Sequence, residues 1–195
     1  LLGLLLGTVL GCATALIVNA LPLAKRYVMP VVVASQALPV FAIAPLLVLW
    51  FGFGLASKII MATLIIYFPI TSAFYDGLRR TDPDLLDLGR IAGASSFQSL
   101  LHLRLPSALP ALSSGLRVGA TLAPIGAVVG EWVGSSAGLG FVMLHANARM
   151  QTDLMFAALI ILAVFVLLLR LATEHLTRRL LFWMPESHGG SPSLS

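Results

Sequence analysis

Long runs of apolar residues, separated by short polar stretches, dominate the pattern of this 195-residue chain. About 20 consecutive apolar residues suffice for a helix to cross a bilayer. The pattern predicts five membrane-spanning helices, at residues 1–24, 38–53, 58–75, 112–133 and 154–172. Pro39 and Pro45 interrupt the second run and Pro69 the third, so kinks are expected there, because proline removes a backbone hydrogen bond. Residues 27–37 are expected to form a short amphipathic connector at the membrane surface.

Composition places the chain among integral membrane proteins. Hydrophobic residues make up 58% of the chain and charged residues only 10%, whereas soluble domains carry roughly 25% charged residues. The net charge of +4 does not indicate nucleic-acid binding, because the basic residues do not form one patch interleaved with aromatic residues. The sequence therefore predicts an all-α, polytopic membrane fold embedded in a lipid bilayer.

The basic residues divide unequally between the two sides of this layout. Lys58 and Arg149 fall on one side. The other side carries Lys25, Arg26, Arg79, Arg80, Arg90, Arg104, Arg117, Arg170, Arg178 and Arg179. Loops rich in Lys and Arg stay in the cytoplasm, so the second side is predicted to be cytoplasmic. Five spans and a cytoplasmic C-terminus then place Leu1 outside.

Glycines recur at short, helix-like intervals in two of the predicted spans. They are Gly3, Gly7 and Gly11 in the first span, and Gly115, Gly119, Gly126, Gly130 and Gly134 in and beside the fourth. Small residues at such spacings let helix backbones approach each other closely. These faces are therefore predicted to be helix–helix contacts.

A polar segment at residues 81–110 separates the third and fourth spans. Asp82 suits a helix N-cap, and Pro83 suits the first helical position because its missing N–H has no partner there anyway. This helix is expected to end near Gly93, since glycine adopts the left-handed backbone conformation that commonly follows a helix.

A second short helix is expected directly after that glycine. Ser95 and Gln98 have the spacing of a capping box, in which each side chain binds the backbone N–H of the other residue. Pro106 is expected to end this helix, because the residue before a proline avoids the helical region. The segment is thus predicted to be two short helices joined by a glycine hinge.

The spacing of residues in this segment resembles the EAA signature of ABC importer permeases, which reads Glu-Ala-Ala, three residues, Gly, nine residues, Ile-x-Leu-Pro. The matching positions here are Asp87, Leu88, Gly89, Gly93, Leu103, Leu105 and Pro106. Asp87, Leu88 and Gly89 depart from the usual triplet, and the interior glycine is expected to weaken the first helix by roughly 1 kcal/mol relative to alanine. The resemblance implies that these residues, together with Ala94 and Ser95, form a cytoplasmic coupling loop that docks onto an ATPase subunit.

The resemblance covers residues 1–183 and fits the nitrate/sulfonate/taurine-type branch of these permeases. It implies a type I ABC importer fold in the bacterial inner membrane, working as a homodimer with an ATP-binding subunit and an extracytoplasmic substrate-binding protein. Members usually have six spans, so one helix is expected upstream of residue 1. Residues 130–157 resemble hydroxymethylpyrimidine (thiamine-precursor) permeases, while sulfonates, taurine, nitrate and riboflavin-like compounds are alternative substrates. Residues 184–195 are expected to form a disordered tail.

The motifs of nucleotide binding and the spacings of metal ligands are missing from these 195 residues. The sequence contains no G-x-x-x-x-G-K-[ST] loop. Its four histidines are scattered, without the spacing of metal ligands. No catalytic residue, metal or cofactor is therefore expected, and ATP would be bound by the partner subunit.

Four polar residues in or near the spans are candidates for a substrate path. Glu131 ends an apolar run, where a charge is costly without a partner or water. It either lines the path or its gate, or is an interfacial carboxylate held by backbone donors of the next loop. Tyr67, Ser72 and Gln36 are further candidates, although interhelical hydrogen bonding is the favoured explanation for each.

Two other function classes were weighed against the permease interpretation. A stand-alone secondary transporter or channel normally has paired acidic groups or broken helices that bind a coupling ion near the bilayer midplane. Here only Glu131 is a candidate, and it has no obvious partner. A membrane-bound hydrolase could use Ser136, which lies in a G-x-S-x-G run, but it would need a strand–turn–helix context with His and Asp partners. Neither alternative explains the spacing in the loop, so a permease is the predicted function.

Overall fold

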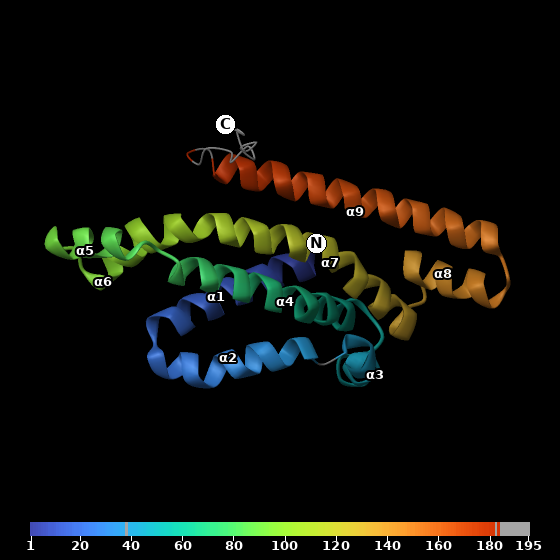
Figure 1. Ribbon diagram of the computed structural model, residues 1–195. Helices are drawn as coiled ribbons and strands as arrows, with labels where there is room; N and C mark the ends of the chain where they lie inside the picture. Colours follow the sequence, from blue (N-terminus) through green and yellow to red (C-terminus); the bar gives the residue numbers. More distant parts are fainter. Residues whose placement is uncertain (38, 182, 184–195) are drawn as a thin grey trace, which may run out of the picture.

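The computed structural model describes residues 1–37, 39–181 and 183, and within these residues the protein is helical throughout, without strands (Figure 1). The helices are α1 (Leu2–Ala20), α2 (Pro22–Ala37), α3 (Val40–Phe51), α4 (Leu55–Arg79), α5 (Pro83–Ile91), α6 (Ser96–Ser99), the π-helical turn η1 (Leu100–Arg104), α7 (Leu105–Gly134), α8 (Leu139–Ala148) and α9 (Thr152–Leu180). The all-α fold class is confirmed. The tail predicted at residues 184–195 lies outside the described residues.

Among the described residues, four helical segments are long and apolar enough to cross a membrane: α1, α4, the continuous segment Ser96–Gly134, and α9. The predicted spans at residues 58–75, 112–133 and 154–172 lie inside three of them. The first span is shorter than predicted, because α1 ends at Ala20 and α2 begins at Pro22. Leu21 between them is extended (φ −119°, ψ 109°), as the residue before a proline prefers.

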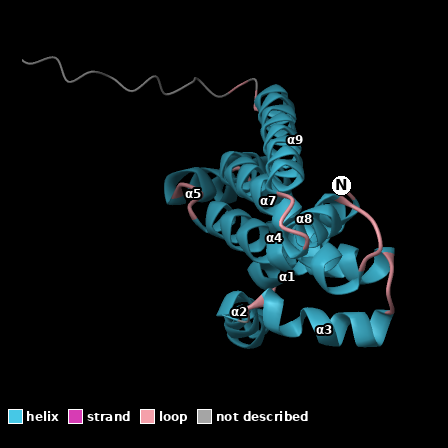
Figure 2. Ribbon diagram, turned by 90° about the vertical axis from the view of Figure 1, so that its right-hand side faces the viewer, coloured by secondary structure: helices cyan, strands magenta, loops and turns pink. Residues whose placement is uncertain are grey.

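The second span differs from the prediction. A kinked spanning helix was expected at residues 38–53, but α3 has only 12 residues. It is therefore about 18 Å long and too short for a core of about 30 Å. It can complete a span only with α2, and the two meet at 101°. Figure 2 shows α2 end-on and α3 lengthwise. The expected surface connector therefore belongs, with α3, to a bent helix pair of the kind found in broken spans and re-entrant loops.

Proline chemistry explains that break. Pro39 is the N-cap of α3, with an extended backbone (φ −66°, ψ 116°), and it offers no N–H to continue a preceding helix. Pro45 and Pro69, by contrast, lie inside α3 and α4. Gly52, with φ 77°, forms the turn from α3 into α4.

Helix α4 packs between α1 and α7 and forms the centre of the bundle (Figure 1). The glycine faces predicted from their spacing make these contacts. A Cβ built on Gly7 would lie 3.1 Å from Ile66 of α4, and one built on Gly126 would lie 2.7 Å from the Ala62 Cα. Close backbone approach, which only small residues permit, therefore holds the three helices together.

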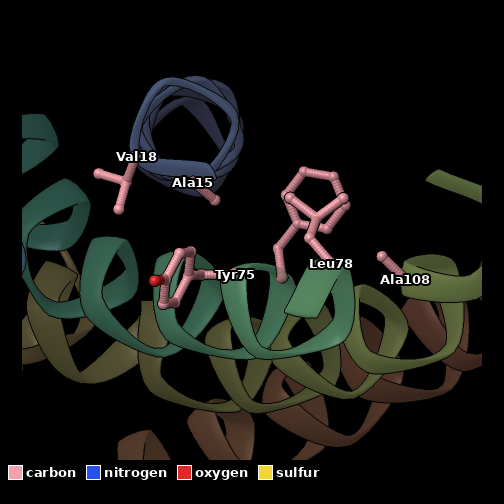
Figure 3. Packing of buried hydrophobic residues seen from close by; sticks show 6 residues of the cluster. Ala15, Val18, Tyr75, Leu78 and Ala108 are labelled. Atoms are coloured by element: carbon pink, nitrogen blue, oxygen red, sulfur yellow. The ribbon is translucent and has the colours of Figure 1, made fainter. Parts of the chain in front are cut away.

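One buried cluster joins α1, α4 and α7 near the end of the bundle that carries the loop. Figure 3 shows Ala15 and Val18 of α1 beside Tyr75 and Leu78 of α4, with Ala108 of α7 nearby. All five side chains are buried. This cluster fixes the ends of α1 and α4, from which the polar loop extends.

The turns and short helices separate into two ends of the molecule (Figure 1). The α1–α2 turn, α5, α6 and the C-terminal end of α9 lie at one end, and α3 and α8 lie at the other. Eight of the ten residues assigned to the cytoplasm lie in the first group or beside it: Lys25, Arg26, Arg79, Arg80, Arg90, Arg104, Arg178 and Arg179. Arg117 and Arg170 lie within α7 and α9, whereas Lys58 and Arg149 lie at the opposite end. The folded chain thus keeps the charge asymmetry on which the predicted orientation depends.

Candidate functional site

The first half of the polar loop folds as its sequence predicts. The Asp82 carboxylate accepts a hydrogen bond from the Asp84 N–H at 2.9 Å, and Pro83 occupies the first turn of α5. After α5, Gly93 has φ 79°. Its N–H donates to the Arg90 carbonyl at 3.0 Å. Local capping chemistry therefore defines both ends of this nine-residue helix.

The second half begins with the predicted capping box. The Ser95 N–H donates to the Gln98 Oε1 at 2.8 Å, and the Gln98 N–H donates to the Ser95 Oγ at 3.2 Å. Three side-chain cap bonds therefore stabilise the segment from Asp82 to Gln98. Ala94 lies between the two helices, and its N–H donates to the Gly89 carbonyl at 2.9 Å.

Pro106 does not end this second helix, contrary to the prediction. Helix α6 continues through η1 into α7, and the Leu105 N–H donates five residues back to the Leu100 carbonyl. This wider π-helical turn places Pro106 in the first turn of α7, where a missing N–H is tolerated. The second half of the loop is consequently continuous with the membrane-spanning helix α7.

Gly89 has a packing role that its sequence position does not reveal. A Cβ at this position would lie 2.9 Å from Leu103 Cδ1. The glycine therefore leaves room for the Leu103 side chain of η1 beside α5. Beside it, the Asp87 carboxylate pairs with the Arg90 guanidinium at 2.8 Å, and both side chains are exposed.

Five large apolar side chains of the loop are exposed, and we call them the apolar loop patch. They are Leu85, Leu88 and Ile91 on α5, Phe97 on α6 and Leu101 on η1. Ile91 is 84% exposed and Phe97 70%. Of these five residues, the sequence had singled out Leu88 alone. The three-residue spacing on α5 was a usable signal, since it places apolar side chains along one side of a helix that lies outside the predicted spans.

The remaining predicted loop residues are mostly less exposed than the patch. Leu103, Leu105 and Pro106 are half-buried, as is Ala94. Ser95 is exposed, with its side chain engaged in the capping box. The loop residues predicted from the sequence are thus brought together in one compact segment at one end of the bundle.

Glu131 lies at the opposite end, in the last turn of α7. Its Oε2 accepts a hydrogen bond from the Gly140 N–H at 2.7 Å, in the first turn of α8. Gly138, the N-cap of α8, has φ 116°, and a Cβ there would overlap the Glu131 carboxylate. The negative charge faces the positive end of a helix. This is the arrangement predicted for a carboxylate held by backbone donors of the next loop.

A second contact at this end ties the α7–α8 loop to α4. The Lys58 ammonium donates to the Ser135 Oγ at 2.6 Å, and that oxygen accepts from the Ala137 N–H at 3.1 Å. Lys58 and Glu131 therefore both position the same short loop. Ser136, the residue of the hydrolase alternative, is exposed in this loop, which connects two helices rather than a strand and a helix.

The other three polar candidates are dispersed. The Tyr67 hydroxyl donates to the Thr14 Oγ1 at 3.0 Å, joining α4 to α1, which is the interhelical bond favoured from the sequence. Ser72 lies farther along α4 and is half-buried, and Gln36 is exposed in the last turn of α2. The structure does not gather these three residues and Glu131 into one site. Within the described ranges, no group of three or more His, Cys, Asp or Glu side chains could hold a metal ion.

Comparison with known protein families gives a match over nearly the whole chain. Residues 3–182 match the family described as "Binding-protein-dependent transport system inner membrane component". The chain belongs to this family. It is a multi-pass inner-membrane permease of an ABC transporter, and neither its family nor its loop supports a hydrolase.

Individual relatives agree with this assignment. A "Probable ABC transporter permease protein" of Haemophilus influenzae is 57% identical over 93% of this chain and 74% of its own length. "Formylaminopyrimidine transport permease protein ThiX" of Halalkalibacterium halodurans is 39% identical over 93% of this chain and 73% of its own. "Putative aliphatic sulfonates transport permease protein SsuC" of Bacillus subtilis is 34% identical over 96% of this chain and 68% of its own length.

A solved structure shows the same fold. The permease aligns with a chain of the MetNI methionine ABC transporter in an inward-facing conformation, with a TM-score of 0.77 and 20% identity over 91% of this chain and 88% of that one. The type I ABC importer fold predicted from the loop signature is therefore confirmed.

Two substitutions of Glu131 distinguish its role as the acceptor of the Gly140 hydrogen bond from a role of its charge in the substrate path. Glu131→Gln keeps an acceptor oxygen for that bond, so this variant is expected to keep near-parental uptake. Glu131→Ala removes the acceptor and leaves a buried N–H unpaired, which costs about 1–3 kcal/mol, so its thermal stability and uptake are expected to fall together. Uptake by intact cells and thermal unfolding of the purified protein would be measured on both variants. Lost uptake in stably folded Glu131→Gln would instead place the charge in the substrate path.

Proposed function

We propose that this permease forms the translocation path for a small polar solute and is coupled, through the loop of α5, α6 and η1, to a separate ATP-binding subunit in the cytoplasm. The observation that carries the proposal is the apolar loop patch. A cluster of exposed apolar side chains on a well-capped segment outside the spans is typical of a protein interaction site.

The energetics favour an occupant for this patch. Fully burying a Leu, Ile or Phe side chain contributes about 1.5–3 kcal/mol, and Leu88, Ile91 and Phe97 are 62%, 84% and 70% exposed. A partner that covers these three side chains would therefore gain several kcal/mol of binding free energy. The capped helices make the patch stiff, so little conformational entropy is lost on docking.

The continuity of the loop with α7 supplies a route for coupling. Displacement of α6 by a docked ATPase would move η1 and α7 as one body, because no break separates them. Helix α7 packs along α4 through its glycine face, so the pair would rock together between inward-open and outward-open states.

ATP would be bound and hydrolysed by the partner, since these residues contain no phosphate-binding loop. The family description names a binding-protein-dependent system, which supports an extracytoplasmic substrate-binding protein as the second partner. We place two copies of the permease in the complex, as a homodimer, so that each loop engages one ATP-binding subunit. Helix α9, of which little is buried within the single chain, leaves a long apolar face for lipid or for that second copy.

For the substrate we propose a pyrimidine precursor of thiamine. The support is the 39% identity to a permease named for formylaminopyrimidine, together with the wording of residues 130–157. Relatives named for riboflavin, aliphatic sulfonates and taurine match at 43%, 34% and 30% identity. Uptake of labelled formylaminopyrimidine, hydroxymethylpyrimidine and taurine by cells carrying the complete transporter would test this choice. Uptake of taurine alone would contradict it.

The docking proposal is tested by charging the patch. Ile91→Asp, alone and with Leu88→Asp, is expected to reduce co-purification of the ATP-binding subunit about tenfold or more, because a carboxylate replaces roughly 1.5–3 kcal/mol of apolar burial. Met150→Asp is the matched control, since Met150 is 83% exposed but lies at the opposite end. Yield and thermal stability should be unchanged in all three variants. Parental co-purification with the double variant would rule out the patch as the docking site.

A further inference from the structure

A cationic hollow lies beneath the loop, where α1 and α4 end. It consists of two adjoining cavities of about 420 and 370 Å³, both lined by Asn19, Leu86 and Arg104. The remaining lining residues of the two cavities are Val18, Ala20, Lys25, Tyr75, Leu78, Arg79, Arg90, Ala94, Ser96, Phe97, Ser99 and Leu100. Four of all these residues are cationic and none is acidic. The transport mechanism proposed above assigns these four cationic side chains no task.

Most of this positive charge is not neutralised within the described chain. Arg90 pairs with Asp87. Arg104 contacts a neutral group, the Asn19 Oδ1, at 3.5 Å, and Arg79 lies 5.6 Å from the centre of the Tyr75 ring. No carboxylate contact is found for Lys25, Arg79 or Arg104 among the described residues.

Helix dipoles do not cancel this charge. The last turns of α1 and α4 reach the hollow, and each helix C-terminus carries roughly half a negative charge. Lys25, Arg79 and Arg104 therefore face two helix C-termini that together carry about one negative charge. Lys25 also belongs to the first turn of α2, where the helix dipole is itself positive. The hollow consequently favours an anion.

An apolar groove adjoins the hollow. Lys25 also lines an open hollow of about 690 Å³ along α2, together with Met29, Pro30 and Val33. The inner wall of the cationic hollow itself is formed by the buried cluster that includes Val18 and Tyr75 (Figure 3). A cationic pocket and an apolar groove that share Lys25 match a molecule with an anionic head and a hydrocarbon chain. A free anion would leave the groove unused.

We propose that this hollow binds the phosphate of an anionic phospholipid from the cytoplasmic leaflet, with one acyl chain along α2. Basic pockets between spanning helices on the cytoplasmic side suit such headgroups. Arg90, Ala94 and Phe97 of the loop line the same hollow, so the lipid bridges the end of α1 and the loop. The proposal takes from the proposed function only the cytoplasmic placement of this end.

The test uses the full-length permease in a neutral detergent, titrated with phosphatidylglycerol or with phosphatidylcholine of the same acyl chains, and native mass spectrometry to count bound lipid. The parent is expected to bind phosphatidylglycerol more tightly than phosphatidylcholine. Lys25→Gln and Arg79→Gln, both at exposed side chains, are each expected to weaken that binding about fivefold, since a cation near an anionic headgroup contributes about that factor. Arg149→Gln, at the opposite end, should bind like the parent.

Three results would overturn the proposal. They are equal binding of the two lipids by the parent, parental phosphatidylglycerol binding by both variants, and displacement of the lipid by inorganic phosphate at comparable concentration, which would make a free anion the ligand. Thermal unfolding of each variant confirms that its fold is intact. The lipid-binding measurement needs no ATP-binding subunit, so a negative result would leave the docking proposal untouched. Failure of the co-purification test would likewise leave the lipid proposal untouched.

Discussion

Replacing Gly126 with leucine should prevent α4 and α7 from packing and leave little stable permease in the membrane. A Cβ at this position would lie 2.7 Å from the Ala62 Cα and 3.1 Å from its backbone nitrogen. Backbone atoms cannot move aside like a flexible side chain, so the two helices must separate along the central contact of the bundle. Loss of this contact also exposes the Ile66 and Ile70 side chains, which are fully buried.

The expected size of this effect follows from overpacking costs. Forcing extra methylenes into a packed core costs typically 1–3 kcal/mol and occasionally more, and the larger figure corresponds to a fall of about 6–12 °C in melting temperature for a chain of this size. Thermal unfolding of the detergent-purified protein, followed by size-exclusion chromatography, measures it. Gly54→Ala is the control, since a Cβ there meets nothing within 4 Å and the backbone is extended. A Gly126→Leu protein that melts with the parent would contradict the packing described.

Gly93→Val should separate folding from coupling. Gly93 has φ 79°, yet a Cβ there meets nothing within 4 Å, so the substitution causes backbone strain and no steric overlap. A left-handed conformation costs an L-residue about 1–2 kcal/mol, and relief of that strain requires α5 to swing away from α6. The fraction of loops in the docking conformation would fall about 5- to 30-fold. The spans, which do not include this residue, should keep their stability.

Two readouts and one control make this prediction specific. Co-purification of the ATP-binding subunit and uptake by intact cells should both fall for Gly93→Val, while its melting temperature stays near that of the parent. Gly93→Asn is the matched variant, because asparagine tolerates the left-handed region far better than a β-branched residue, and it should retain most of the activity. Parental uptake by the valine variant would show that the hinge conformation is not needed for coupling.

The parts of the fold that were predictable depend on neighbours close in sequence. The N-cap at Asp82, the hinge at Gly93 and the capping box of Ser95 and Gln98 are each decided within four residues, so their patterns carry the information. Glycine spacing likewise identified the packed faces of α1 and α7, although it did not show that both pack on α4.

The parts that were missed depend on tertiary context. Pro39, Pro45 and Pro106 have the same local chemistry, yet the first starts a helix after a sharp bend, the second lies inside a helix and the third lies beside a π-helical turn. The role of Gly89 depends on Leu103, which lies fourteen positions later in the chain. Exposure of the apolar loop patch could not be read from its composition, because an apolar stripe on a short helix can equally face its own core.

Cross-linking from position 91 tests the central claim most directly. Ile91→Cys in a Cys12→Ala background would be treated with a thiol-to-amine cross-linker in membranes that contain the ATP-binding subunit, and Met150→Cys would serve as the matched exposed position at the other end. We expect a covalent permease–ATPase product from position 91 and none from position 150. A product from position 150, or none from position 91 when the complex is assembled, would contradict both the orientation of the chain and the assignment of its loop as the ATPase docking site.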